Sequence, residues 1–177
     1  MGFVPVPRNV MSAASKPIVM VAAMDQNRVI GDGAEIPWHI PGEQRLFRQL
    51  TMGKPLILGR LTYETLPNPL PGRHCIVLSK AAGTSKGVAA AKTVEEALRL
   101  AETLPGEEIM VGGGQQIYEL FLPLVHRIYL TEIHATFGGN RFFPKIDGRD
   151  FRLVSSETVR ASVPYSRNIF ERAVSVI

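Results

Sequence analysis

The hydrophobic positions of the chain fall into two patterns, short continuous runs and longer periodic stretches. The continuous runs, rich in valine, isoleucine and leucine, predict strands at 17–24, 55–60, 74–79, 87–91, 107–112 and 126–133. Several are apolar almost throughout, which is typical of strands buried on both faces of a sheet. The periodic stretches predict helices at 41–53, 93–106 and 113–122.

The alternation of strands and helices predicts an α/β fold with a mostly parallel sheet and helices on both faces. The tail after residue 150 holds two further strand patterns with no helix between them, which predicts an antiparallel C-terminal edge. We expect about eight strands in the central sheet. Residues 17–177 should form a single domain, and residues 1–16, which lack the apolar segment of a signal peptide, a flexible N-terminal extension.

Composition narrows the classes of function. The 20 lysines and arginines are scattered without runs or interleaved aromatics, which argues against nucleic acid as a partner despite a net charge of +4. A mildly basic surface suits small polyanions. No apolar stretch reaches the length of a membrane span, and the single cysteine, Cys75, fits a reducing cytoplasm. The histidines show no metal-ligand spacing, so no metal is expected.

One acidic residue is unusual within the helix predicted at 41–53. Glu43 shares a helical face with Leu46, Phe47 and Leu50, which should point into the core. A carboxylate on that face is costly to bury without a partner. Either Glu43 reaches water at the rim of the core, or it awaits a partner that the protein itself does not supply.

A glycine-rich junction between a strand and a helix, "IMVGGGQQIYELF", is a candidate phosphate cradle. Glycines let the backbone approach a ligand closely, and the helix start offers free N–H groups. A plain tight turn is the alternative interpretation. The spacing matches neither the dinucleotide fingerprint nor a P-loop.

Two other strand ends carry polar side chains. Arg60 and Thr62 follow one strand, and Ser79 and Lys80 follow another. Ligands of α/β sheets bind at such carboxyl ends, so these residues could hold the extra phosphate of NADP, although each one alone also fits a solvated surface. The sequence holds no convincing nucleophile–base set, which favours chemistry carried by a cofactor.

These motifs together resemble the dihydrofolate reductase family over nearly the whole chain, from about Pro17 to the last strand. They occur in the family's order: "VAAMDQNRVIGDGAEIPWHIPGE", "ILGRLTYETLPNPLPGR", "IVLS", "IMVGGGQQIYELFLP", "YLTEI" and "FFP". The resemblance offers an answer for Glu43, which matches the family's acid in the pterin pocket. Its partner would be the substrate, whose 2-amino group and adjacent ring nitrogen donate to the carboxylate.

The resemblance implies roles for many positions. The residues implied in catalysis are Glu43, Trp38 and Thr131, the last as a support for Glu43. The substrate-binding residues are Val21, Ala22, Ala23, Ile36, Gln44, Phe47, Leu66, Arg73, Gly112 and Tyr118, with Arg73 gripping the α-carboxylate of the glutamyl tail. The residues implied in NADPH binding are Ala23, Ile30, Gly31, Gly59, Arg60, Leu61, Thr62, Leu78, Ser79, Lys80, Lys92, Gly113, Gly114, Gln115, Gln116 and Ile117. Residues 29–38 match a mobile loop over the nicotinamide, and Gly113 and Gly114 a pair joined by a cis peptide.

Several positions depart from the family pattern. The acid is Glu43 rather than the aspartate common in bacterial enzymes, Gln44 follows it, and Gly112 stands where isoleucine or valine is usual. These three are more like the trimethoprim-insensitive members. Gln116 replaces a common basic residue near the cofactor phosphates, and Asn140 replaces an aspartate that normally contacts the mobile loop.

The resemblance implies NADPH-dependent reduction of 7,8-dihydrofolate to 5,6,7,8-tetrahydrofolate, by hydride transfer to C6 of the pterin. We expect a cytoplasmic monomer that binds neither nucleic acid nor membrane. Two alternatives stay open. A related pyrimidine reductase of riboflavin synthesis would not need Trp38, Glu43 and Arg73 together, and a non-catalytic NADP-binding module would be favoured by a missing acid.

Overall fold

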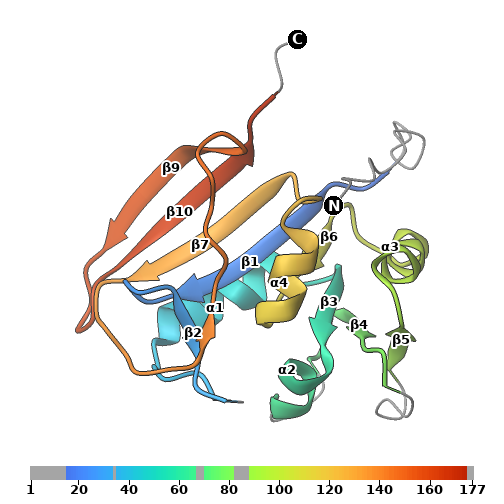
Figure 1. The fold of residues 1–177 in the computed structure, drawn as a ribbon, viewed down its shortest axis with the longest axis horizontal. Helices are drawn as coiled ribbons and strands as arrows, with labels where there is room; N and C mark the ends of the chain where they lie inside the picture. Colours follow the sequence, from blue (N-terminus) through green and yellow to red (C-terminus); the bar gives the residue numbers. More distant parts are fainter. Residues whose placement is uncertain (1–14, 34, 67–69, 82–87, 175–177) are drawn as a thin grey trace, which may run out of the picture.

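The fold is built on one large sheet (Figure 1). The computed structural model describes residues 15–33, 35–66, 70–81 and 88–174. The order of the strands across the sheet is β5-β4-β3-β6-β1-β7-β10-β9. Their bounds are β1 (Ile18–Met24), β3 (Pro55–Gly59), β4 (His74–Leu78), β5 (Ala89–Ala91), β6 (Ile109–Val111), β7 (Arg127–Ile133), β9 (Phe151–Val159) and β10 (Tyr165–Arg172). A second, two-stranded sheet pairs β2 (Val29–Gly31) with β8 (Arg141–Phe142).

The expected strand directions are confirmed. The pairs from β5 across to β7 are all parallel, whereas β10 is antiparallel to both β7 and β9. The parallel strands therefore end at one common edge of the sheet. That edge carries the polar and glycine-rich junctions noted in the sequence.

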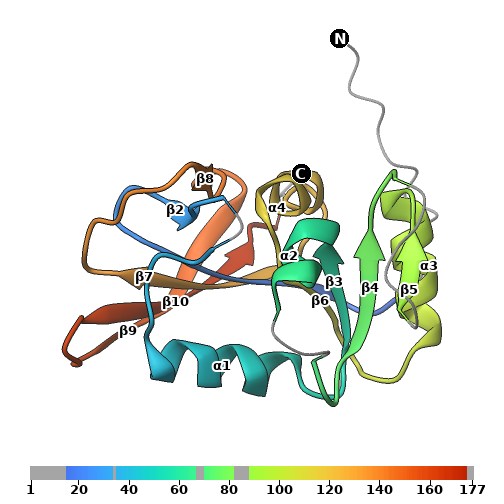
Figure 2. The same ribbon diagram turned by 90° about the horizontal axis from the view of Figure 1, so that it is seen from below.

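Helices lie on both faces of the sheet, as expected (Figure 2). They are α1 (Pro41–Thr51), α2 (Arg60–Thr65), α3 (Val94–Thr103) and α4 (Gln115–Phe121). Residues of β1 alternate between two core clusters. Met20 packs in the cluster that contains Phe121 of α4, and Val19 in the cluster joined by Phe47 and Leu50 of α1. The alternation follows from the period of two along a strand.

The predicted elements were mostly right in kind and too long at their ends. The strand predicted at 107–112 is Ile109–Val111, and Arg60, predicted to end a strand, begins α2. Helix α1 ends at Thr51, and Gly53 follows with a φ of 76°. Helix α3 begins as the capping pattern predicts, since Thr93 Oγ1 accepts a hydrogen bond from Glu96 N–H at 3.1 Å. The short strands β2 and β8 were not predicted, because two or three residues carry too little pattern.

Residues 1–14 of the expected extension, and Gly87 of the fourth predicted strand, lie outside the described residues. Lys16 is held at the end of α3, where its ammonium donates to the carbonyls of Ala101 and Leu104. In the described part of the chain, no helix is long and apolar enough to cross a membrane.

Candidate active site

A glycine-framed junction forms at the carboxyl edge of the sheet. Gly113 and Gly114 are joined by a cis peptide, and Gly59 N–H donates to Gly113 O at 2.8 Å. A Cβ on Gly59 would lie 3.1 Å from the Ile117 side chain, and one on Gly114 would lie 3.1 Å from Thr62 Oγ1. The structure thus brings together five of the expected cofactor residues, and a side chain at Gly59 or Gly114 would crowd its neighbour.

The register of the sheet aligns the polar strand ends beside this junction. Gly59 pairs with Leu78, and Leu78 with Ala91, so Arg60, Ser79 and Lys92 follow at adjacent positions. Arg60 Nε forms an ion pair with Glu64 at 2.9 Å, one helical turn away. Ser79 Oγ accepts a hydrogen bond from Ala81 N–H at 3.2 Å. Lys80 and Lys92 are exposed, and Leu61 is too.

Glu43 lies half-buried in the first turn of α1. Its carboxylate makes no hydrogen bond or ion pair with the described residues. Burial raises the pKa of Glu43 to about 7. The buried hydroxyl of Tyr118 donates to Val21 O at 2.8 Å, and its pKa is raised by burial and by the nearby Glu43 charge. Among the described residues, the carboxylate of Glu43 therefore has neither a hydrogen-bond partner nor a cationic partner.

Thr131 and Trp38 are the two other residues expected in catalysis. Thr131 of β7 is 4% exposed and lies opposite Ala23 of β1. Trp38 packs against Phe137, with ring centroids 5.5 Å apart. The indole N–H of Trp38 is buried and finds no partner among the described residues. A buried donor without a partner is costly, so this N–H is available to a ligand or water.

The expected apolar walls are only partly assembled. Phe47 and Leu66 pack against the cluster that contains Val21, whereas Ala22 faces the cluster on the α4 side. Ile36 is 65% exposed and does not form a wall in this structure. A contact of Ile36 with the substrate rings stays a prediction.

Gly112 has a clear steric role. A Cβ built there would lie 2.8 Å from Leu58 Cδ2, 3.0 Å from Leu56 Cδ1 and 3.5 Å from Phe47 Cε2. These side chains fill the space that a larger residue at 112 would occupy. The space beside Gly112 is therefore filled by these side chains rather than open.

Arg73, the residue expected to bind the glutamyl tail, has buried guanidinium atoms without partners among the described residues. These atoms are Nε and Nη1. Burial lowers the pKa of Arg73, Cys75 raises it, and Arg48 lowers it further. Arg48 also lines an open hollow of about 440 Å³ together with Arg45, Gln49 and Met52 on the outer side of α1. A guanidinium without partners, as in Arg73, suits a carboxylate ligand.

The loop after β2 is attached to the segment before β8. Asn140 Oδ1 accepts from Gly33 N–H at 2.7 Å, and Asn140 N–H donates to Gly31 O at 3.0 Å. Asparagine therefore makes a loop contact at the position where the family's aspartate is expected. Ile30 and Gly31 lie in β2, and Gln115 Oε1 accepts from Phe142 N–H at 2.9 Å, which ties α4 to β8. Gln116 is exposed.

Sequence reasoning missed one buried group, Asp25, which directly follows β1 and accepts three backbone hydrogen bonds. A signal for the local bonds was present, because aspartate at a strand end favours turns in which its side chain caps the next residues. The long-range bond to Phe137 had no signal in the sequence.

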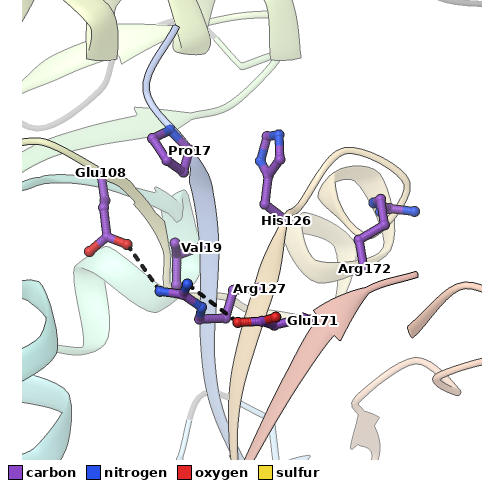
Figure 3. Close-up of a pocket in the computed structure, with 7 residues that line it drawn as sticks. All are labelled: Pro17, Val19, Glu108, His126, Arg127, Glu171 and Arg172. Atoms are coloured by element: carbon purple, nitrogen blue, oxygen red, sulfur yellow. Dashed lines mark hydrogen bonds and ion pairs between the residues drawn. The ribbon is translucent and has the colours of Figure 1, made fainter. Parts of the chain in front are cut away.

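A separate hollow of about 300 Å³ lies at the opposite end of β1, near Pro17 and His126 (Figure 3). Its acids are paired, since Arg127 lies 3.7 Å from Glu108 and 3.5 Å from Glu171. Both acids of this hollow are therefore paired, in contrast to Glu43.

The described residues contain no group of histidines, cysteines or acids that could hold a metal ion.

The fold and the site together combine a mostly parallel α/β sheet, a glycine-framed junction at its carboxyl edge and one acid, Glu43, that has no partner among the described residues. The family model for dihydrofolate reductase matches residues 17–172, and the chain belongs to the dihydrofolate reductase family.

Individual relatives agree with this assignment. The chain is 41% identical to dihydrofolate reductase type A13 of Escherichia coli, over 92% of this chain and 98% of the relative. It is 38% identical to the dihydrofolate reductase of Bacillus subtilis (strain 168), over 79% of this chain and 83% of the relative. The structure of Enterococcus faecalis dihydrofolate reductase complexed with NADP(H) and RAB-propyl is similar, with a TM-score of 0.83, 31% identity, and coverage of 88% and 96% of the two chains.

Proposed function

We propose that the chain catalyses NADPH-dependent reduction of 7,8-dihydrofolate to 5,6,7,8-tetrahydrofolate. The observation that carries this proposal is the half-buried carboxylate of Glu43, which has no partner among the described residues and lies in a member of the dihydrofolate reductase family. A pyrimidine reductase or a non-catalytic module loses support, because the dihydrofolate reductase model matches residues 17–172 and the chain has Trp38, Glu43 and Arg73 together.

The substrate would bind with its pterin ring against Glu43. The carboxylate accepts hydrogen bonds from the 2-amino group and the adjacent ring nitrogen, and Thr131 supports it. Phe47 and Leu66 contact the rings, and the unpaired guanidinium of Arg73 receives the α-carboxylate of the glutamyl tail.

The residues at the glycine-framed junction fit a dinucleotide. Gly113 and Gly114 bring the backbone close to the ligand, with Thr62 beside them. Arg60, Ser79 and Lys80 would hold the 2′-phosphate. Arg60 would break its ion pair with Glu64 when it binds the phosphate. The cofactor, when bound, supplies the hydride that is added to C6 of the pterin. Holding two rings in register provides much of the rate enhancement.

The proton that N5 of the pterin gains would come from water. Glu43 fixes and polarises the ring from the side of the 2-amino group rather than donating to N5. The unpaired indole N–H of Trp38 is suited to position a water molecule in the same pocket. We further propose a cytoplasmic monomer, which is consistent with the single cysteine.

The direct test is to mix the purified protein with dihydrofolate and follow the oxidation of NADPH or NADH by absorbance. We expect kcat/KM to be more than tenfold higher with NADPH, because each charge-assisted hydrogen bond to the 2′-phosphate is worth about 1.5–3 kcal/mol. The variant Lys80→Ala should narrow the preference, whereas Lys145→Ala, a lysine in none of the expected site motifs, should not. Equal kcat/KM values for the two cofactors would refute the phosphate site.

A further inference from the structure

Asp25 is a fully buried acid outside the expected set of site residues. Its side chain is 0% exposed. Oδ1 accepts hydrogen bonds from Asn27 N–H at 2.8 Å and Val29 N–H at 2.9 Å, and Oδ2 accepts one from Phe137 N–H at 2.8 Å. The described residues give it no cationic partner. Three backbone donors therefore compensate the burial of this charge.

The three bonds connect two segments that are far apart in the chain. The first segment is the tight turn 25–29, in which Arg28 has a φ of 65°, a value that side-chain-bearing residues rarely adopt. The second ends at Phe137, and Gln26 N–H adds a bond to Ala135 O at 3.3 Å. The carboxylate thus fixes a strained turn and a distant segment to each other.

Both segments lead to Trp38. The turn continues into β2 and then into the loop that ends at Trp38. The ring of Phe137 packs directly on the indole. At its other end, the segment 137–140 reaches the same loop through Asn140, which accepts a bond from Gly33 N–H. Asp25 and Asn140 therefore hold the two ends of this segment against the loop.

We propose that Asp25 is a positioning residue for the reductase reaction: it holds Phe137 against Trp38 and so fixes the Trp38 indole, whose buried N–H has no partner among the described residues. The reaction itself rests on the proposed function. The carboxylate suits this task because each of its two oxygens accepts, one toward the turn and one toward Phe137. An amide has a single acceptor and would turn an N–H toward one of these donors.

The variant Asp25→Asn tests this role with two readouts. Trp38 is the only tryptophan of the chain, so its fluorescence reports directly on the loop. We expect quenching of Trp38 by acrylamide to rise at least twofold, and hydride transfer in a single turnover to slow at least tenfold. Both are measured at a temperature where circular dichroism shows the variant folded. Unchanged quenching and an unchanged hydride-transfer rate would overturn the proposal.

A second variant decides the matter if Asp25→Asn does not fold. Phe137→Leu keeps the backbone bond to Asp25 and removes the ring that packs on Trp38. It should show the same slowing of hydride transfer. A double variant of Asp25→Asn with Asn140→Ala should lose less than the product of the single losses, because both act through one loop. Fully multiplicative losses, or normal hydride transfer in Phe137→Leu, would contradict the proposal.

Asp147→Asn is the matched control, because Asp147 also accepts a hydrogen bond from the backbone N–H two residues later, at 2.8 Å, but lies outside the site. It should leave both readouts unchanged. The fluorescence readout needs no turnover, so it separates the two ideas. An inactive parent protein with a quenching change in Asp25→Asn would count against the reductase activity while supporting the role of Asp25 in the loop.

Discussion

Glu43→Gln is expected to give a protein that is more stable than the parent at alkaline pH and at least tenfold less active on dihydrofolate. Glutamine keeps the shape of the side chain but removes the charge. Activity falls because a charge-assisted hydrogen bond becomes a neutral one, and an amide cannot accept from both pterin donors. NADPH affinity should change little, since the cofactor residues lie at the glycine-framed junction.

The gain in stability follows from the raised pKa of Glu43. Its value of about 7 in the folded protein exceeds the ordinary value of 4.5, so the folded state binds the proton more tightly than the unfolded state does. That stabilisation is fully present below pH 4.5 and is lost as the pH rises through 7. At about pH 8 the parent should be about 2–3 kcal/mol less stable than Glu43→Gln, after allowance for the remaining contact with water.

Urea unfolding of both proteins between about pH 5 and pH 8 measures this difference. The difference in the free energy of unfolding between Glu43→Gln and the parent should increase as the pH rises through 7. Glu95→Gln is the control, because Glu95 also lies in the first turn of a helix but is exposed. It should shift stability by no more than about 1 kcal/mol. A Glu43→Gln protein with parental turnover would remove Glu43 from catalysis, and a pH-independent gap would contradict its raised pKa.

The sequence was informative where the relevant pattern is local. The apolar face around Glu43 and the glycine run at 112–114 are readable within one element, and so the unpaired acid and the junction could be predicted. The position of Gly112 shows the limit. That Leu56, Leu58 and Phe47 converge on it depends on how β3, β6 and α1 pack, which no local pattern contains.

The loop over the site shows a second limit. The bond from Phe137 N–H to Asp25 spans 112 residues and involves a backbone group that every residue but proline carries. The residue types at its two ends therefore do not reveal it. The exposure of Ile36 and the ion pair of Arg60 with Glu64 are likewise properties of the folded surface, and the family resemblance did not foretell them.

Trimethoprim is expected to bind this protein about 30- to 1,000-fold more weakly than an otherwise similar enzyme with aspartate at position 43, which corresponds to roughly 2–4 kcal/mol. Glutamate is one methylene longer than aspartate, so its carboxylate reaches further into the pocket and displaces a diaminopyrimidine outward. The pocket has little room to absorb this shift on the Gly112 side, because Leu56, Leu58 and Phe47 already occupy it. The displaced trimethoxyphenyl ring would also meet the polar amide of Gln44.

Inhibition constants for trimethoprim and methotrexate, measured side by side, test this expectation. Methotrexate carries a glutamyl tail that the unpaired guanidinium of Arg73 can hold, so its affinity should remain high. Glu43→Asp should restore much of the trimethoprim affinity while changing that for methotrexate far less, and Gln44→Leu should recover a smaller part. Low-nanomolar inhibition of the parent by both drugs would show that the pocket relaxes around the longer acid. In that case the extra methylene and Gln44 would not control which antifolates bind.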